Sequence, residues 1–214
     1  NFFFFFTLPE GEISGKILAG YQANNVLIKF FFIFGGNKRG LIFDVRYSNK
    51  MVHAYRNKYD GYVLNSGFKE NSANAMIGLN RSWGYSHLHL SAYRIMPGIV
   101  EGERDSLTGQ FLKPVLVNGE EGFEVAGHSD FYSYSQQIPY QDVNHYKAVL
   151  NNSFLIGKST LKATIGWQQN RRKEFADVSA PDQYGLYFYL NTINYDAKYI
   201  LPVYKGLNLS FGVN

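Results

Sequence analysis

Polar and apolar residues alternate one by one along several stretches of the chain. Between residues 41 and 47 the odd positions Phe43, Val45 and Tyr47 are apolar, whereas Asp44 and Arg46 between them are charged. A period of two is typical of a β-strand with one dry face and one wet face. The same alternation recurs at residues 13–22, 87–92, 160–168 and 207–213. The sequence therefore predicts an all-β fold.

The alternation and the turn residues between the segments predict about ten strands. Their ranges are 12–23, 25–35, 40–53, 60–68, 71–83, 85–96, 142–156, 159–172, 184–200 and 206–214. The segment 184–200 is longer than the five or six residues usual for a strand. Because roughly 9 to 11 residues cross a bilayer as a tilted strand, this segment is long enough to span a membrane and project beyond it. Periodicity alone does not distinguish the wall of a membrane β-barrel from a soluble β-sandwich.

The predicted connections alternate strictly between very short and long. Tight turns are expected at residues 37–40, 83–85, 157–158 and 202–206, and long polar loops at 52–69, 97–140 and 172–183. This asymmetry is typical of outer-membrane β-barrels, which have short periplasmic turns and longer extracellular loops. We therefore predict an antiparallel meander of long strands that forms part of a transmembrane β-barrel, with function on the end that carries the loops.

Composition is consistent with a lipid-facing wall. Aromatic residues make up 17% of the 214 residues and charged residues only 18%, below the roughly 25% of soluble domains. The mean hydropathy is −0.24, and no apolar run reaches the roughly 18 residues that a transmembrane helix needs. The net charge of +4 comes from scattered basic residues, so the chain is not expected to bind nucleic acid. Two phenylalanine-rich runs, 2–6 and 30–34, are apolar on both faces and do not fit the alternation.

Four spans, taken in order, resemble the barrel of TonB-dependent outer-membrane receptors, closest to receptors for iron complexes and cobalamin. They are Leu8–Glu12, Tyr21–Asn25, Val100–Asp105 and Trp167–Phe175. The resemblance implies a barrel of about 22 strands around an N-terminal plug. It also implies active uptake of a scarce ligand with energy passed on by TonB.

The chain departs from that family pattern in lacking a plug, a TonB box and a recognisable closing strand. Residues 1–214 are therefore expected to be a partial barrel in the outer membrane, without the plug domain through which TonB would act. The expected partners are outer-membrane lipid and a small-molecule ligand such as a metal chelate. We expect no cofactor.

The long loop between residues 97 and 140 holds most of the candidate ligand-binding residues, because loops of this length are usually functional or disordered. The candidates are Glu101, Glu103, Arg104, Asp105, Tyr132 and Tyr134, joined by Arg171 and Arg172 near the end of a strand. Guanidinium groups offer a planar donor fork for an anionic ligand such as a ferric chelate. The alternatives are a solvated acidic loop and an ordinary ion pair made by the two arginines.

No catalytic or metal-binding constellation emerges from the sequence. His87 and His89 share one face of a strand, but no third ligand is near them in sequence, so no metal site is predicted. The chain has none of the motifs G-x-S-x-G, H-E-x-x-H, P-loop or Rossmann fingerprint. An enzyme, such as a lipase barrel, is therefore a minor alternative. There are two further alternatives to the receptor barrel. One is a passive porin-like or small self-closing barrel, and the other is a soluble β-sandwich binding module.

Overall fold

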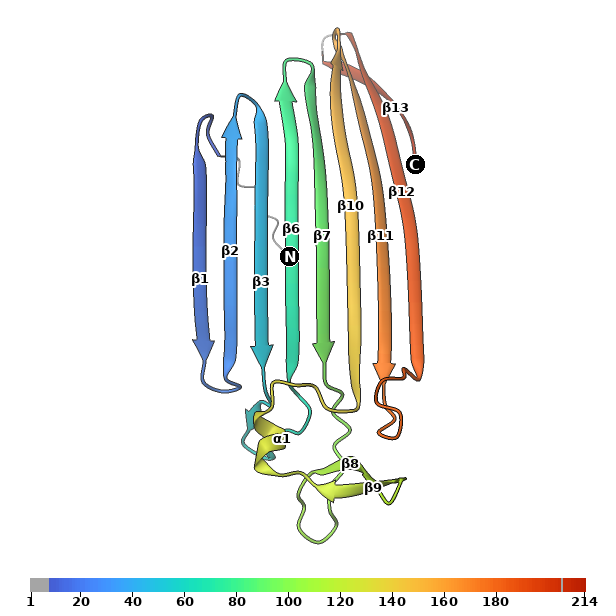
Figure 1. Cartoon of the computed structure of the whole chain (residues 1–214). Coiled ribbons are helices and arrows are strands. Elements are labelled where there is room, and N and C mark those ends of the chain that lie inside the picture. The colour runs from blue at the N-terminus through green and yellow to red at the C-terminus, as the bar shows by residue number, and fades with distance from the viewer. Residues whose placement is uncertain (1–7, 205) are drawn as a thin grey trace.

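A single antiparallel sheet of nine long strands dominates the computed structural model, which describes residues 8–204 and 206–214 (Figure 1). The strands are β1 (Ile13–Gln22), β2 (Leu27–Lys38), β3 (Leu41–Val52), β6 (Phe68–Arg81), β7 (Gly84–Pro97), β10 (Tyr140–Ile156), β11 (Ser159–Phe175), β12 (Leu186–Tyr204) and β13 (Leu207–Val213). They lie side by side in sequence order, and within the described residues β1 and β13 form the two free edges. The predicted all-β antiparallel meander is confirmed, as an open sheet.

One predicted strand is wrong. Residues 60–67 do not join the sheet, since this stretch belongs to a loop that holds a hairpin of the two-residue strands β4 (Arg56–Asn57) and β5 (Gly61–Tyr62). Val63 and Leu64 pack against Phe111 instead of pairing as a strand. The apolar residues that suggested a strand are thus used in a small core among the loops.

The two ends of the sheet differ, as the connections predicted. At one end the hairpins β2–β3, β6–β7, β10–β11 and β12–β13 close through tight turns, and Gly157 adopts a φ of 61° that favours glycine. At the other end lie residues 53–67, 98–139 and 176–185, which we call the loop layer (Figure 1). The prediction that short and long connections alternate strictly is wrong, however, because β1 and β2 are joined at this end by only the four residues 23–26.

The loop between β7 and β10 was expected to be irregular, and it has secondary structure of its own. It contains a hairpin of β8 (Leu112–Val117) and β9 (Glu120–Val125), followed by the five-residue helix α1 (His128–Tyr132). Of the helical residues described, none belongs to a helix long and apolar enough to cross a membrane.

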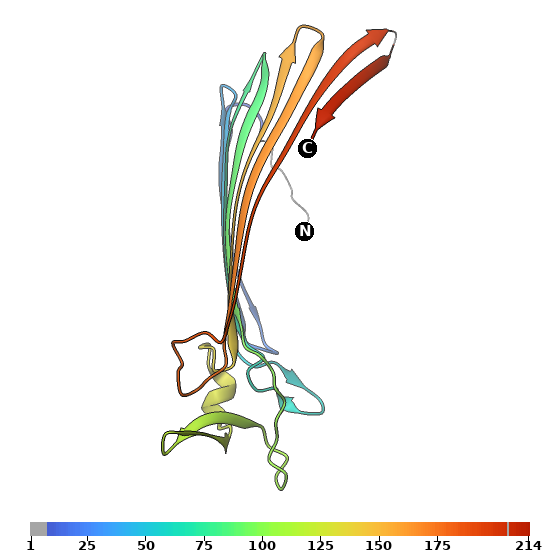
Figure 2. The same cartoon turned by 90° about the vertical axis from the view of Figure 1, so that its right-hand side faces the viewer.

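The two faces of the sheet show a reversed burial pattern. Val45 on the apolar face is 42% exposed, whereas its neighbour Asp44 on the polar face is 8% exposed. Ile17 and Ile193 on the apolar face reach 66%. Side chains crowd together on the inside of a bend, and the sheet is curved (Figure 2), so this difference indicates that the polar face is concave. A water-soluble sheet buries its apolar face instead.

Strand register turns the apolar face into continuous rows of cross-strand neighbours. One row runs through Phe43, Ile77, Leu88, Leu150, Ile165 and Tyr195, and the next through Val45, Ala75, Leu90, Ala148, Trp167 and Ile193. Along β1 and β2 the apolar positions extend over nine residues, 13–21 and 28–36. These rows together form what we call the apolar band.

A row of polar residues borders the apolar band on the side of the loop layer. It consists of Asn49, Asn71, Arg94, Asn144 and Arg171, and ends at Tyr189. Aromatic residues at this border point their polar atoms toward it. The Tyr47 hydroxyl donates to Asn71 Oδ1 at 3.0 Å, and the Trp167 indole N–H donates to Asn191 Oδ1 at 2.7 Å. The polar row, which we call the border row, therefore gives the band a sharp edge.

The phenylalanine-rich runs have different outcomes. Residues 2–6 lie outside the described residues. In β2, Phe30, Phe32 and Phe34 belong to the apolar band, whereas Phe31 and Ile33 lie on the polar face beside Ser48 and Arg46. The alternation therefore continues through the run in the backbone register, although the sequence hides it.

Candidate functional site

The loop layer has a small hydrophobic core that gives it a fixed shape. Val63, Leu64 and Phe111 are buried together, and Ala126 and Phe131 pack against them. These residues come from both long loops, 53–67 and 98–139. Because apolar burial is what makes a loop hold one conformation, the loop layer is a folded surface and not a solvated coil.

Asn65 connects the two long loops. Its backbone φ is 58°, a left-handed conformation that asparagine tolerates better than most residues. Its side-chain amide nitrogen lies 3.1 Å from the Ile99 carbonyl, 3.2 Å from that of Gln137 and 2.5 Å from that of Pro139. The side chain thus holds both ends of the β7–β10 connection against the loop 53–67.

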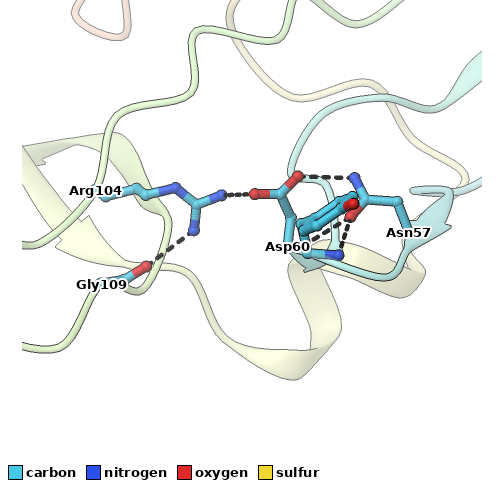
Figure 3. A network of polar contacts seen from close by, with 5 residues as sticks. Asn57, Asp60, Arg104 and Gly109 are labelled. Carbon is cyan, nitrogen blue, oxygen red and sulfur yellow. Dashed lines mark hydrogen bonds and ion pairs between the residues drawn. The ribbon is translucent and has the colours of Figure 1, made fainter.

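Arg104 connects the same loops at a second point (Figure 3). Its guanidinium donates to Asp60 Oδ1 at 2.6 Å and to the Gly109 carbonyl at 2.9 Å, and it stacks 3.9 Å above the centre of the Phe111 ring. Asp60 also accepts a hydrogen bond from the Asn57 side chain at 2.7 Å. Both of these guanidinium hydrogen bonds are made to the protein itself, so Arg104 serves to position the loops.

An aromatic cluster lies where the loop layer meets the sheet. The His53 side chain, 2% exposed, has the rings of Tyr132 at 5.0 Å, Tyr134 at 5.8 Å and Tyr62 at 6.0 Å. The Tyr134 hydroxyl donates to the Val26 carbonyl at 2.9 Å and so reaches the β1–β2 turn. Of the predicted ligand residues, Tyr132 and Tyr134 therefore contribute to packing between loops.

An open cavity of about 290 Å³ lies at the side of the loop layer. Its lining is Lys113, Pro114 and Val115 of β8, Asp130 of α1, Gln137, Ile138 and Val178. The three segments that form it are β8, the chain from α1 to β10, and the loop between β11 and β12. Parts of two long loops enclose this space, and its volume approaches that of a small-ligand site.

The polar groups of the cavity are fixed by one another. Lys113 Nζ lies 2.9 Å from Glu124 Oε1 and 3.0 Å from Asp130, and the Gln137 side-chain amide donates to Asp130 Oδ1 at 3.2 Å. The hydrogen bond to Glu124, opposed by burial and assisted by Asp130, raises the pKa of Lys113 above its usual value. Lys113 therefore stays a cation at neutral pH, at the rim of an otherwise largely apolar lining.

Glu101 lines a smaller hollow that shares Lys113, Pro114, Gln137 and Ile138 with the cavity. Burial raises the pKa of the Glu101 carboxyl, and the negative charges of Glu103 and Glu121 raise it further. Glu101 is thus the predicted candidate that lies nearest to an enclosed space.

Two further candidates have local roles. Asp105 accepts hydrogen bonds from the Thr108 hydroxyl at 2.6 Å and the Thr108 amide at 2.7 Å, and these bonds lower the pKa of its carboxyl. Glu103 accepts the Leu112 amide with its backbone carbonyl at 3.0 Å. Asp105 therefore shapes the turn 105–109, and Glu103 contributes charge near Glu101.

Arg171 and Arg172 are not brought together. Both lie within β11, which extends to Phe175, so their side chains lie on opposite faces of the sheet. Arg171 is paired in register with Tyr189, on the face of the apolar band. Arg172 lies on the polar face, with Nη2 3.7 Å from Glu174 Oε2, which is the intrastrand ion pair considered as the alternative.

His87 and His89 do lie on one face, with ring centres 6.4 Å apart. The nearest side-chain partner of His87 is Asn80, whose Oδ1 is 2.7 Å from Nε2. Over residues 8–204 and 206–214, no three histidine or acidic side chains come together as a metal site would require. The structure therefore adds no metal-binding candidate to the loop layer.

Sequence reasoning missed most of the residues that shape the cavity. Asn65 stands in the run Asn65-Ser66-Gly67, a turn signal that could have marked it. Lys113, Asp130 and Gln137 carry no such signal, because their contacts form only when the loop 98–139 folds back on itself. Comparison of the chain with known protein families, with curated proteins and with solved structures finds no match.

Proposed function

We propose that this chain forms part of the wall of an outer-membrane β-barrel of the TonB-dependent receptor type, with the loop layer receiving the ligand. The observation that carries the proposal is the reversed burial of the sheet. Ile165 is 52% exposed on the apolar face, while Ser153 is 7% exposed on the polar face. Such a sheet suits a hydrocarbon solvent on one side and a watery lumen on the other.

The dimensions of the apolar band fit the hydrocarbon core of a bilayer. On β12 the apolar positions run from Ile193 to Leu201, nine residues, which is close to the roughly 9 to 11 that a tilted strand needs to cross a bilayer. With strands about 4.8 Å apart, nine of them make a band roughly 40 Å wide. An apolar surface of that extent exceeds the roughly 300 to 600 Å² of the largest patch on a soluble monomer.

The aromatic border supports the same orientation. Tryptophan and tyrosine favour the interface between hydrocarbon and water, where the ring is apolar and its N–H or O–H finds a polar partner. Trp167 and Tyr47 have that arrangement, since each donates to an asparagine at the edge of the band. The loop layer then lies outside the bilayer.

The ligand proposed for the loop layer is a small molecule such as an iron chelate. The support is the cavity of about 290 Å³, which combines an apolar lining with fixed polar groups at Lys113, Asp130 and Gln137. The resemblance to iron-complex receptors supplies the chemical class. The mechanism is binding followed by energy-dependent uptake, without bond chemistry.

Cysteine labelling tests the wall. The chain has no cysteine, so Ile165→Cys and Thr164→Cys each introduce a single thiol, on adjacent residues of opposite faces. In cells, a water-soluble maleimide should label Thr164→Cys and leave Ile165→Cys unlabelled until detergent extraction and unfolding. Equal labelling of both in intact membranes would contradict a lipid-facing band.

Uptake of a radiolabelled ferric chelate tests the transport. We expect accumulation in cells that express this barrel segment within a receptor that has a plug domain, and its loss when an uncoupler collapses the proton gradient. Accumulation that withstands the uncoupler would indicate the passive, porin-like alternative.

A further inference from the structure

Two cations lie on the lipid-facing side, at and just beyond the border row. Arg171 belongs to that row, and Lys173 lies two residues further along β11, on the same face and nearer the loop layer. Trp167 precedes Arg171 by four residues on the same face, about 13 Å at 3.3 Å per residue. The two cations thus lie where the hydrocarbon of a bilayer ends and its headgroups begin.

Aromatic rings hold both cations in place. The Arg171 guanidinium lies 5.9 Å from the centre of the Tyr189 ring, and Lys173 Nζ lies 4.9 Å from that of Tyr184 and 6.0 Å from that of Tyr187. A cation over a ring face keeps most of its N–H donors free. The rings therefore limit the motion of the side chains without using their hydrogen-bonding capacity.

The neighbouring strand β10 does not supply a counter-ion for Arg171 and Lys173. Asp142 is the register partner of Lys173, yet both of its carboxylate oxygens bind Arg94, at 2.9 and 2.8 Å, and Asn144 donates to it at 2.9 Å. Within the part of the chain described, neither Arg171 nor Lys173 forms an ion pair with an acidic side chain. Both charges are therefore available to an external anion.

We propose that Arg171 and Lys173 bind the phosphate groups of anionic lipids in the leaflet next to the loop layer. Phosphate offers several acceptor oxygens, which suit the guanidinium fork and the ammonium group side by side. A cation near an anionic membrane surface contributes a factor of about five in binding. This inference rests on the proposed lipid-facing wall, and it names the lipid that the wall would select.

Trp167 fluorescence provides the test. In a Trp83→Phe background Trp167 is the remaining tryptophan of the chain, close to the acyl chains of any lipid held at Arg171. The protein would be reconstituted in phosphatidylcholine vesicles that contain brominated phosphatidylglycerol or, in a parallel series, brominated phosphatidylcholine. We expect brominated phosphatidylglycerol to quench Trp167 at least about fivefold more effectively than brominated phosphatidylcholine.

Two variants separate this site from general attraction by the basic chain. Arg171→Gln with Lys173→Gln should remove the preference while both lipids still quench. Arg172→Gln removes one cation from the same strand on the opposite face, and it should leave the preference unchanged.

Equal quenching by the two lipids in the unmutated site, or an undiminished preference in the double variant, would overturn the inference and leave the wall intact. A loss of preference in Arg172→Gln equal to that in the double variant would overturn it too. Quenching by neither lipid would instead overturn the lipid-facing wall itself, and the inference with it.

Discussion

Asn65 shows how one polar side chain can organise two loops at once. Its side-chain amide nitrogen lies within hydrogen-bonding distance of three carbonyl groups of the β7–β10 connection. Backbone carbonyls that are buried without a donor cost free energy, so the residue acts on atoms more than thirty positions away in sequence. Arg104 and Tyr134 act in the same way, on Asp60 and on the Val26 carbonyl.

Replacing Asn65 tests this role. Asn65→Ala should destabilise the loop layer by about 1 to 3 kcal/mol, through the lost hydrogen bonds and the left-handed φ that alanine disfavours. Asn65→Gly keeps the φ and loses the amide, so the difference between the variants separates the two causes. Hydrogen exchange of amides in residues 98–139 measures the effect. Protection unchanged in both variants would show that the side chain does not hold the loops.

Glu101 gives the loop layer a pH dependence with a definite sign. Its folded pKa is raised above the ordinary 4.5, first by burial and then by Glu103 and Glu121. The folded state therefore binds the proton more tightly, and the associated stability is present below pH 4.5 and lost as the pH rises through the folded pKa. At neutral pH the ionised Glu101 carboxylate therefore destabilises the loop layer.

Glu101→Gln should remove that effect. At neutral pH the variant should show slower hydrogen exchange in the loop layer than the unmutated protein, and the difference should vanish below pH 4.5. Glu120→Gln, the same charge change at an exposed turn of the β8–β9 hairpin, is the control. A difference that does not depend on pH, or faster exchange in Glu101→Gln at neutral pH, would contradict the assignment.

At the scale of the strand, the same pattern of alternation has opposite meanings in water and in lipid. Residues 160–168 of β11 alternate cleanly, and the sequence predicted the strand from that alone. The pattern also places Ile165 and Thr164 on opposite faces. Which face is covered is decided by the neighbouring elements, and nothing in the local sequence records it.

A lysine placed on each face of β11 distinguishes the two solvents. Ile165→Lys should destabilise a membrane-embedded sheet by about 2 to 4 kcal/mol, because a charge on the lipid face loses its hydration. Thr164→Lys should be tolerated on the polar face, beside Asp196 and Asn151. Unfolding in urea from lipid vesicles measures both. Since Ile165 is already half exposed, equal stability of the two variants would indicate water on both faces.

At the scale of the whole molecule, the exposed apolar band decides the behaviour in solution. We expect the purified protein to require detergent, and to aggregate when the detergent is removed, because the band is far larger than a soluble surface tolerates. Sedimentation with and without detergent measures this. A stable monomer in buffer alone would favour the soluble binding module considered from the sequence.

The sheet could be predicted well and the candidate site poorly. Strand positions follow from a period of two that each strand carries in its own residues, so all nine strands of the sheet begin and end within four residues of their expected bounds. The apolar residues Val63 and Leu64 misled the prediction of a strand at 60–68, because a short apolar run fits a loop core equally well. Arg171 and Arg172, adjacent in sequence, are separated by the sheet itself.

The sequence by itself determined the alternation of the faces, the tight turns and the end at which the loops gather, because each depends on the preferences of neighbouring residues. The tertiary structure alone decided that the polar face is the crowded one, that a polar row ends the apolar band, and that Lys113, Asp130 and Gln137 meet in one cavity. These features depend on strand register and on contacts between residues that are not neighbours in sequence. Local pattern carries no information about such contacts until the strands are paired.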